Sequence, residues 1–415
     1  MSCRHIYIFL LSILWLAQVS SQPIGTDLLD GEYSTKIPFK IKNGFIVVKL
    51  KFGGELPVNF IYDTGAEHTI LFHKSYSDLL GIDYAQRIEI KGSDLNANQY
   101  ALVARNVNLR LDNQIMVKRD VLILENFMEL FQQSLGIDID GVIGASFFRA
   151  MVVEIDYRKN FIKLYDPNRF KMKRKGYTTI DIDIRRNKPY MMASSVFNLN
   201  DTIKTKLLID TGASIPFLLH ANTDSALVIP EHVISGPIGQ GITGQLEGFI
   251  GKIRGLQFGP YQFNGILTLF QDLPTHEDTS LVLTRNGIIG NDLLSRFSVI
   301  IHYLRGKLYL KPYKKKYNED FDYDKSGMII YAIGPELNQF YVKTVIPGTP
   351  AHEAGILPGD MIKRVGIWKD RFWTLEKLNN HLQKRDGKKI RMVIERYGVR
   401  IRKTFRLRDF FNDLP

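Results

Sequence analysis

The sequence predicts a mainly β protein, in which a bilobal pair of duplicated β units is followed by a small α+β module. Three observations lead to this prediction. The chain of 415 residues contains an internal duplication. Within each copy, apolar and polar residues alternate as they do in half-buried strands. After about residue 324 the pattern changes, and a helical period of apolar residues lies between alternating segments.

The duplication rests on three landmarks, each present twice. They are Asp-Thr-Gly-Ala at 63–66 and 210–213, Gly-Val-Ile-Gly at 141–144 with Gly-Ile-Ile-Gly at 287–290, and Ile-Asp-Tyr at 155–157 with Ile-His-Tyr at 301–303. The spacing between equivalent residues is 147 at the first landmark and 146 at the other two. A solenoid needs three or more repeats, so two copies in register predict a pseudo-two-fold pair.

Short alternating segments predict the strands of both copies. Residues 37–52 alternate on either side of Asn43-Gly44, which is a hairpin signal. Further strands are expected at 161–165, 180–184 and 307–311. Helical signals are few, and the best in the first copy are 75–80 and 121–134.

The end of the chain predicts a compact α+β module behind a linker. The linker is the charged and aromatic stretch 314–324. Residues 375–385 form an amphipathic helix, with Leu375, Leu378 and Leu382 on one face. The other expected elements are two strands within 328–346, a short helix at 349–355, a turn at 357–360, and strands at 361–365, 389–396 and 403–407.

The first 21 residues predict a cleaved secretory signal, and therefore a secreted or periplasmic protein. A short polar start precedes an apolar run at 6–19, which ends in small residues suited to cleavage. The run is shorter than the roughly 20 residues that span a bilayer, so an uncleaved anchor is the lesser alternative, and we expect no stable membrane span. The single cysteine, Cys3, lies in this segment. A mature chain without thiols excludes disulfides, thiolate zinc sites and a cysteine nucleophile.

The net charge of +12 is concentrated in 171–175, 311–316 and the last thirty residues. We interpret these basic runs as solvated faces, with attraction to an anionic surface or acidic polymer as the alternative. No nucleic-acid partner is predicted. The nine histidines show no metal-ligand spacing, so no metal and no cofactor are expected. Serine-nucleophile, zinc-protease and phosphate-loop motifs are absent from the sequence.

The repeated Asp-Thr-Gly loops offer a specific chemistry at Asp63 and Asp210. Two carboxylates about 3 Å apart cannot both ionise, so one keeps a proton. The ionised member can take a proton from water, and the protonated member can polarise a substrate carbonyl. Such a pair titrates as a unit, so the sequence does not assign the proton to either aspartate.

This pattern resembles the aspartic proteases, from residue 37 to about 312. It is more similar to the retroviral-type (retropepsin-like) branch than to pepsin, because the copies are short, lack cysteine and both carry Ala after the glycine. The resemblance implies lobes at 22–170 and 171–318. It implies catalysis by Asp63 and Asp210, and support of the two catalytic loops by four neighbouring residues. These are Thr64, Gly65, Thr211 and Gly212.

Two further expectations concern pH and substrate access. Ala66 and Ala213 supply no hydroxyl to the carboxylates, which predicts raised pKa values and best activity at mildly acidic to near-neutral pH. The glycine-rich stretch 236–251 predicts a mobile hairpin that closes over the cleft, with 89–101 as its counterpart. An ordinary glycine-rich surface loop is the alternative interpretation of the first stretch.

The module resembles a PDZ domain, with 319–415 as its predicted range. The resemblance lies in Val-Ile-Pro-Gly-Thr-Pro-Ala at 345–351 and in Ala-Gly-Ile-Leu-Pro-Gly-Asp-Met-Ile at 354–362. It implies binding of an extended peptide or a protein C-terminus at a sheet edge. The loop that would hold the terminal carboxylate is expected at 332–335 or 336–340. A packing module that binds no ligand is the alternative.

Together these patterns predict a secreted aspartic endopeptidase with a C-terminal PDZ domain. Its polypeptide substrate would lie in the cleft between the lobes, where water is activated between Asp63 and Asp210. Because both loops lie on one chain, a monomer can form the whole site. The alternative is a catalytically inactive, protease-like protein that binds peptides.

Overall fold

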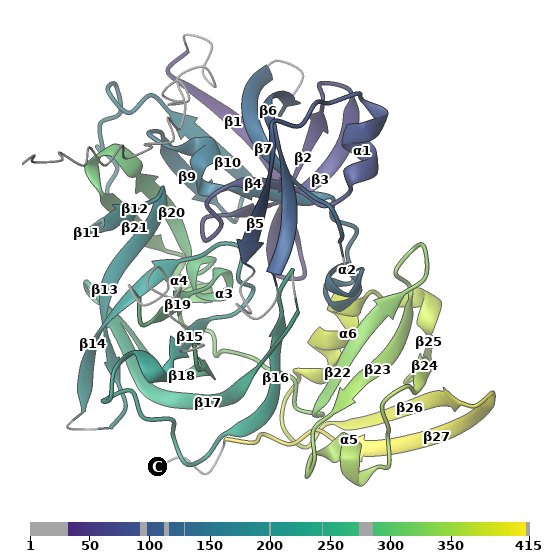
Figure 1. Ribbon diagram of the computed structural model, residues 1–415. Helices are drawn as coiled ribbons and strands as arrows, with labels where there is room; N and C mark the ends of the chain where they lie inside the picture. The colour runs from purple at the N-terminus through teal and green to yellow at the C-terminus, as the bar shows by residue number, and fades with distance from the viewer. Residues whose placement is uncertain are drawn as a thin grey trace, which may run out of the picture.

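The computed structural model describes residues 32–91, 98–111, 116–127, 129–198, 201–242, 244–273 and 285–411. The predicted signal at 1–21 lies outside these residues. Strands dominate the described chain, which confirms the mainly β prediction (Figure 1). None of the helices in the described ranges has the length and apolar character needed to cross a bilayer.

The first half of the repeat begins with a three-stranded meander. Its elements are β1 (Ser34–Lys42), β2 (Phe45–Phe52), β3 (Leu56–Asp63), β4 (Thr69–Leu71), α1 (Lys74–Leu79), β5 (Gln86–Lys91), β6 (Asn98–Arg110), β7 (Met116–Leu124), α2 (Leu130–Leu135), β8 (Gly141–Gly144), β9 (Val152–Asp156) and β10 (Phe161–Tyr165). The hairpin predicted at Asn43-Gly44 is confirmed, since both residues have positive φ between β1 and β2.

The second half repeats this order with its own helical insertions. Its elements are β11 (Thr178–Asp181), β12 (Asp183–Arg185), β13 (Lys188–Val196), β14 (Thr202–Ile209), β15 (Phe217–His220), β16 (Ile234–Gln240), β17 (Gln245–Phe258), β18 (Tyr261–Gln271), β19 (Gly287–Ile289), α3 (Asn291–Leu294), β20 (Phe297–His302), β21 (Lys307–Pro312) and α4 (Lys314–Tyr317). In both halves the strand before the aspartate runs parallel to the strand of the second landmark, as β3–β8 and β14–β19.

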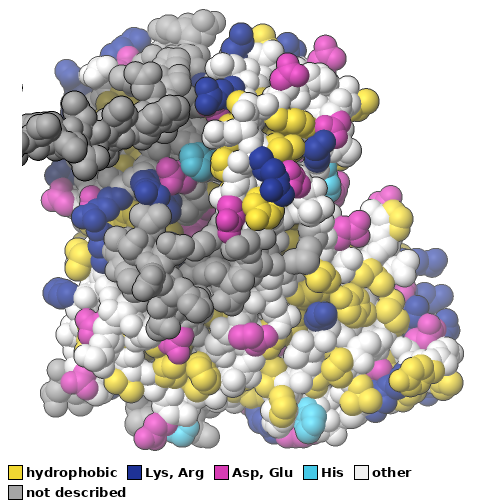
Figure 2. Space-filling model, in the orientation of Figure 1, with side chains coloured by type: hydrophobic (Ala, Val, Ile, Leu, Met, Phe, Trp, Pro, Cys, Tyr) yellow, Lys and Arg dark blue, Asp and Glu magenta, His cyan; other side chains and the backbone are white. Residues whose placement is uncertain are grey.

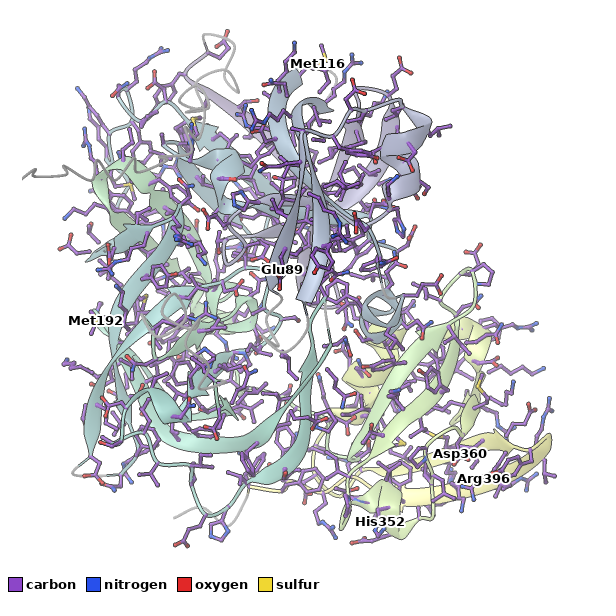
Figure 3. The ribbon with its side chains drawn as sticks, in the orientation of Figure 1. Glu89, Met116, Met192, His352, Asp360 and Arg396 are labelled. Carbon is purple, nitrogen blue, oxygen red and sulfur yellow. The ribbon has the colours of Figure 1, made fainter. Side chains whose placement is uncertain are left out.

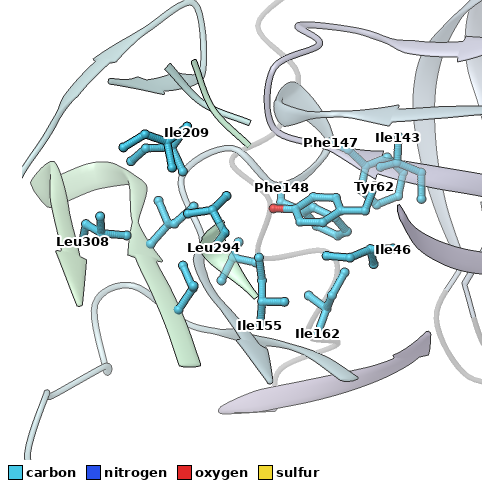
Figure 4. Packing of buried hydrophobic residues seen from close by; sticks show 14 of the residues in the cluster. Ile46, Tyr62, Ile143, Phe147, Phe148, Ile155, Ile162, Ile209, Leu294 and Leu308 are labelled. Atoms are coloured by element: carbon cyan, nitrogen blue, oxygen red, sulfur yellow. The ribbon is translucent and has the colours of Figure 1, made fainter. Parts of the chain in front are cut away.

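The two halves share one sheet and one core. Strand β9 pairs antiparallel with β20, with Val153 opposite Ile301 and Ile155 opposite Val299. This pairing joins strands of both halves in a 13-stranded sheet that runs from β11 to β5. Beneath it, a single cluster of buried apolar side chains contains residues from both halves, including Ile155 and Ile209 (Figure 4). The two Asp-Thr-Gly loops therefore stand on a continuous apolar floor.

The C-terminal module has a core of its own. It contains β22 (Met328–Ile333), β23 (Gln339–Val345), α5 (Pro350–Glu353), β24 (Met361–Val365), β25 (Trp368–Lys369), α6 (Leu375–Leu382), β26 (Lys389–Arg396) and β27 (Val399–Arg406). Leu375, Leu378 and Leu382 are buried in this core, as the amphipathic pattern predicted. Arg396 donates from Nε and Nη2 to the buried Asp360, at 2.6 and 2.8 Å, and so anchors the 357–360 turn (Figure 3).

One helix prediction was wrong. The helix expected at 121–134 is a strand up to Leu124, and only Leu130–Leu135 is helical. Strand β7 lies between β4 and β6, and its last four residues are all buried, so its apolar run lacks the alternation that distinguishes a strand from a helix. The stretch predicted as a linker, 314–324, also packs against the core of the two halves through Tyr317 and Phe321.

We expect the basic runs to be solvated faces, and on the side drawn in Figure 2 the Lys and Arg side chains lie among Asp and Glu side chains. Elsewhere two of the runs meet: Lys311 Nζ donates to the Lys175 carbonyl at 3.4 Å.

Candidate active site

Asp63 and Asp210 occupy equivalent places at the ends of two parallel strand pairs. Asp63 is the last residue of β3 and lies opposite Gly144 of β8. Asp210 directly follows β14, and its N–H donates to the carbonyl of Ile289 in β19 at 2.9 Å. In a parallel pair the two strands end at the same edge, so each aspartate leaves its sheet where the chain must turn. The structure brings both turns together although 147 residues separate them.

The two loops are interlocked by their threonines, which are fully buried. Thr64 Oγ1 donates to the carbonyl of Ile209 at 2.6 Å and accepts the N–H of Thr211 at 3.0 Å. Thr211 Oγ1 donates to the carbonyl of Tyr62 at 2.8 Å and accepts the N–H of Thr64 at 3.1 Å. Each hydroxyl thus satisfies one donor and one acceptor of the opposite loop. The four bonds hold the loops at one separation.

The glycines of the two loops allow the carboxyl groups to approach. A Cβ atom placed on Gly65 would overlap the carboxyl group of Asp210, and one placed on Gly212 would overlap that of Asp63. Neither position has room for a side chain. The carboxyl group of each half therefore lies against the backbone of the other half, as the predicted dyad requires.

Backbone N–H groups orient the carboxylates. Asp63 Oδ1 accepts from Gly65 and Ala66 at 2.7 and 3.0 Å, and Asp210 Oδ1 accepts from Gly212 at 2.8 Å. Burial and the adjacent Asp210 carboxyl raise the pKa of Asp63 well above its ordinary value, and the two N–H donors oppose this only in part.

The glycines of the second landmark lie too close to the neighbouring backbone to carry a side chain. A Cβ on Gly144 would overlap the carbonyl of His68, and a Cβ on Gly290 would overlap that of Ile215. The chain just beyond each landmark bonds back to the loop, as Ala145 N–H donates to the Ala66 carbonyl at 2.8 Å and Asn291 N–H to the Ala213 carbonyl at 2.7 Å. Both Asp-Thr-Gly loops are therefore braced from behind in the same way.

Sequence reasoning missed a third brace, the β1–β2 turn. Ser214 Oγ donates to the carbonyl of Asn43 at 2.9 Å, and Asn291 Nδ2 donates to the carbonyl of Gly44 at 2.6 Å. The turn of the first half thus supports the loop that carries Asp210 in the second half. The Asn-Gly pair signalled only a local hairpin, so its long-range contact had no mark in the sequence.

Two cations near the dyad were also missed. Burial lowers the pKa of Lys188 and of Arg285, while the charges of Asp210 and Asp63 act in the opposite direction on both. Lys188 begins β13, and Arg285 lies two residues before β19. They place positive charge on the second-half side of the site. No sequence motif distinguishes them from other lysines and arginines.

Both segments expected as flaps are antiparallel hairpins. Strands β5 and β6 pair from Gln86–Val103 to Lys91–Asn98, and Glu89 lies on β5 where the first half faces the second (Figure 3). The tip at 92–97 is outside the described residues. Strands β16 and β17 form the second hairpin, with a register shift between Pro237 and Gly239. Just beyond β16, Ile242 packs against apolar residues of the first half, so this hairpin reaches across both halves.

The comparison with known families supports this geometry. Residues 48–147 match the family model of the aspartyl proteases. The matched segment contains Asp63 and Gly144 but not Asp210. Over this range the chain is similar to an aspartyl protease, and the match supports a peptidase of the aspartyl type. No curated protein matches the sequence.

The predicted carboxylate-binding stretches of the module lie at one end of its first hairpin. Residues 332–335 close β22, and 336–340 form the turn and the start of β23. Among the described residues, no group of three or more His, Asp, Glu or Cys side chains is arranged to hold a metal ion.

Proposed function

We propose that the protein is a secreted or periplasmic aspartic endopeptidase of the retropepsin-like type, active as a monomer. The observation that carries the proposal is the reciprocal bonding of Thr64 and Thr211, which sets Asp63 and Asp210 against each other on one apolar floor. A loop pair without a catalytic role would not need two carboxyl groups in mutual contact, because that contact costs stability whenever both are ionised.

The proposed reaction is direct attack of water on a peptide carbonyl. The ionised carboxylate accepts a proton from water while the protonated one donates a hydrogen bond to the carbonyl oxygen, and hydroxide adds to the carbon. The proton then reaches the leaving amine as the C–N bond breaks. The raised pKa of Asp63 supports a singly protonated dyad at mildly acidic pH. The β5–β6 and β16–β17 hairpins are the proposed flaps that exclude bulk water.

The C-terminal module is proposed to be a PDZ domain that recognises a peptide or a protein C-terminus. Its strand order, β22-β23-β24-β26-β27, leaves β22 at an edge of the sheet among the described strands. An extended peptide can add to such an edge through main-chain hydrogen bonds. This role would bring substrates or regulators to the protease, in keeping with the fusion of both parts on one chain.

Cleavage of a peptide library by the purified chain, with and without pepstatin, tests the peptidase proposal. Asp63→Asn and Asp210→Asn are each expected to lower kcat/KM by about 10³-fold or more, since neither half can supply both proton-transfer groups. Asp138→Asn, at an exposed aspartate of the first half, is the matched control and should leave kcat/KM unchanged. Cleavage that survives Asp63→Asn would rule out the mechanism. Absence of cleavage at every pH would favour the inactive peptide-binding protein.

A further inference from the structure

The edge strand of the module's sheet is covered by a helix of the first half. Helix α2 packs against β22, the edge strand (Figure 1). At the C-terminal end of α2, Gly136 adopts φ +62°, and a Cβ there would lie 2.5 Å from Cβ of Leu375, the first residue of α6. The helix therefore sits at the junction of β22 and α6, which we name the β22–α6 groove.

Helix α2 is buried on two faces. Phe131 and Leu135 belong to the apolar cluster of the first half. Leu130, Gln133 and Ser134 follow the i, i+3, i+4 spacing of a different face, and all three are only half-exposed. A six-residue helix has too few internal bonds to be stable alone, so packing on both sides holds it in place.

The docked module also touches the β16–β17 hairpin. Tyr331 of β22 donates its hydroxyl to Oε1 of Gln240, the last residue of β16, at 3.0 Å. A Cβ on Gly236 of β16 would lie 3.9 Å from Cγ1 of Ile346. At the other end of the module, Lys252 of β17 lies 5.7 Å from the ring centroid of Phe411. Hydrophobic side chains gather on the module near this junction (Figure 2).

A second connection runs from α2 to the catalytic loop. Asn43 Nδ2 donates to the carbonyl of Leu135, the last residue of α2, at 2.8 Å. The carbonyl of the same Asn43 accepts from Ser214, four residues after Asp210. Displacement of α2 would thus remove a support of the turn that braces this loop.

We propose that α2 is the resident occupant of the β22–α6 groove, and that this contact holds the module against the β16–β17 hairpin. The groove is then closed to other ligands while α2 is seated. A peptide that adds to β22 must displace α2, and its binding frees the hairpin that spans the two halves. The inference extends the proposed peptide-recognition role of the module, but it concerns a contact that exists whether or not the chain cleaves peptides.

Hydrogen–deuterium exchange on the full chain tests this, in an Asp63→Asn background that excludes self-cleavage. Ser134→Arg places a long charged side chain on the half-buried face of α2, and Ser134→Ala is the matched control. We expect amides of β22 and β16 to exchange at least about tenfold faster in Ser134→Arg, as local opening becomes easier, with β3 and β8 unchanged. In Ser134→Ala, all four strands should exchange at the parental rate.

Tyr331→Phe provides a second test that leaves every buried apolar contact in place. It removes only the hydroxyl bond to Gln240, so β16 should exchange a few-fold faster while α2 and β22 do not change. If β22 of a folded Ser134→Arg chain exchanges at the parental rate, α2 does not occupy the groove. If β22 exchanges faster in Ser134→Arg while β16 exchanges at the parental rate in both Ser134→Arg and Tyr331→Phe, the module does not hold the β16–β17 hairpin. Failure of Ser134→Arg to fold would leave Gln133→Lys to apply the same test.

Discussion

The two halves of the repeat are alike at their Asp-Thr-Gly loops and differ a few residues away. At the centre, Thr64 and Thr211 exchange equivalent bonds, and Gly65 and Gly212 make equivalent approaches. Away from it, the module meets helix α2 of the first half and strand β16 of the second half. The module thus contacts the two halves through different elements.

One equivalent pair of residues differs between the halves, although each residue makes the same hydrogen bond. In the first half, Asp140 Oδ2 accepts the N–H of Asn59 at 2.7 Å. In the second half, Asn286 Oδ1 accepts the N–H of Lys206 at 2.9 Å. The backbone requires one acceptor in each place, and a carboxylate or an amide supplies it. The two halves keep the same residues where their loops bond to each other. Their residues differ where the bond forms within one half.

Among the substitutions that compare the two halves away from the aspartates themselves, the largest effects are expected from Gly65→Ala and Gly212→Ala. The added Cβ overlaps the carboxyl group of the opposite half, so each variant should misplace the dyad and lower kcat/KM by about 10²-fold or more. Equal losses in peptide-cleavage assays would support equivalent loops. Thermal unfolding serves as the control for global folding, and unchanged activity in either variant would show that the carboxyl groups need not lie so close.

A smaller effect is expected from Thr64→Val and Thr211→Val. Each removes a buried hydroxyl and leaves one N–H and one carbonyl without a partner, at a cost of about 2–4 kcal/mol in the free energy of unfolding. Urea denaturation measures the loss, and Thr→Ser at each position is the control that keeps the hydroxyl. A difference above about 1 kcal/mol between the two variants would show that the halves share the interlock unequally.

Asp63→Asn should raise stability at neutral pH. Because the folded-state pKa of Asp63 is raised by burial and by Asp210, the parental chain loses stability as pH rises from the unfolded-state pKa of about 3.9 through the folded-state pKa. The variant avoids this loss, so its advantage should be near zero at pH 3 and on the order of 1 kcal/mol at pH 7. A pH series of denaturation curves checks this, with Asp138→Asn as the control. An advantage that does not vary with pH would contradict the assignment.

The smallest effect is expected from exchanging the acceptors of the two halves. Burial raises the pKa of Asp140, so Asp140→Asn should be neutral or stabilising by less than about 1 kcal/mol at pH 7, since an amide oxygen still serves Asn59. Asn286→Asp should be destabilising by a similar amount. Denaturation curves at pH 7 and pH 3 separate the effect of the carboxylate charge from that of the hydrogen bond to Asn59. A loss above about 2 kcal/mol in the free energy of unfolding of Asp140→Asn would show that the first half needs the charge.

Several elements could be predicted because their signals are local. The β1–β2 turn carries an Asn-Gly pair, and β10 has the predicted bounds of Phe161–Tyr165. The helix expected at 121–134 failed because β7 is buried between two neighbouring strands, and burial on both faces removes the alternation. The packing of Phe321 against the core was likewise invisible, because a charged stretch with interspersed aromatic residues is typical of a linker.

The sequence by itself determined the repeat, the strand-rich character and the residue types of both loops, since periodicity and duplicated motifs are properties of neighbouring residues. The tertiary structure alone decided that Thr64 and Thr211 exchange bonds, that Asn43 braces the loop of Asp210, and that α2 covers the edge strand of the module. These contacts join residues far apart in the chain. Their partners are chosen by which buried donors, acceptors and apolar faces remain unmet once the sheets have formed, and no local pattern records that choice.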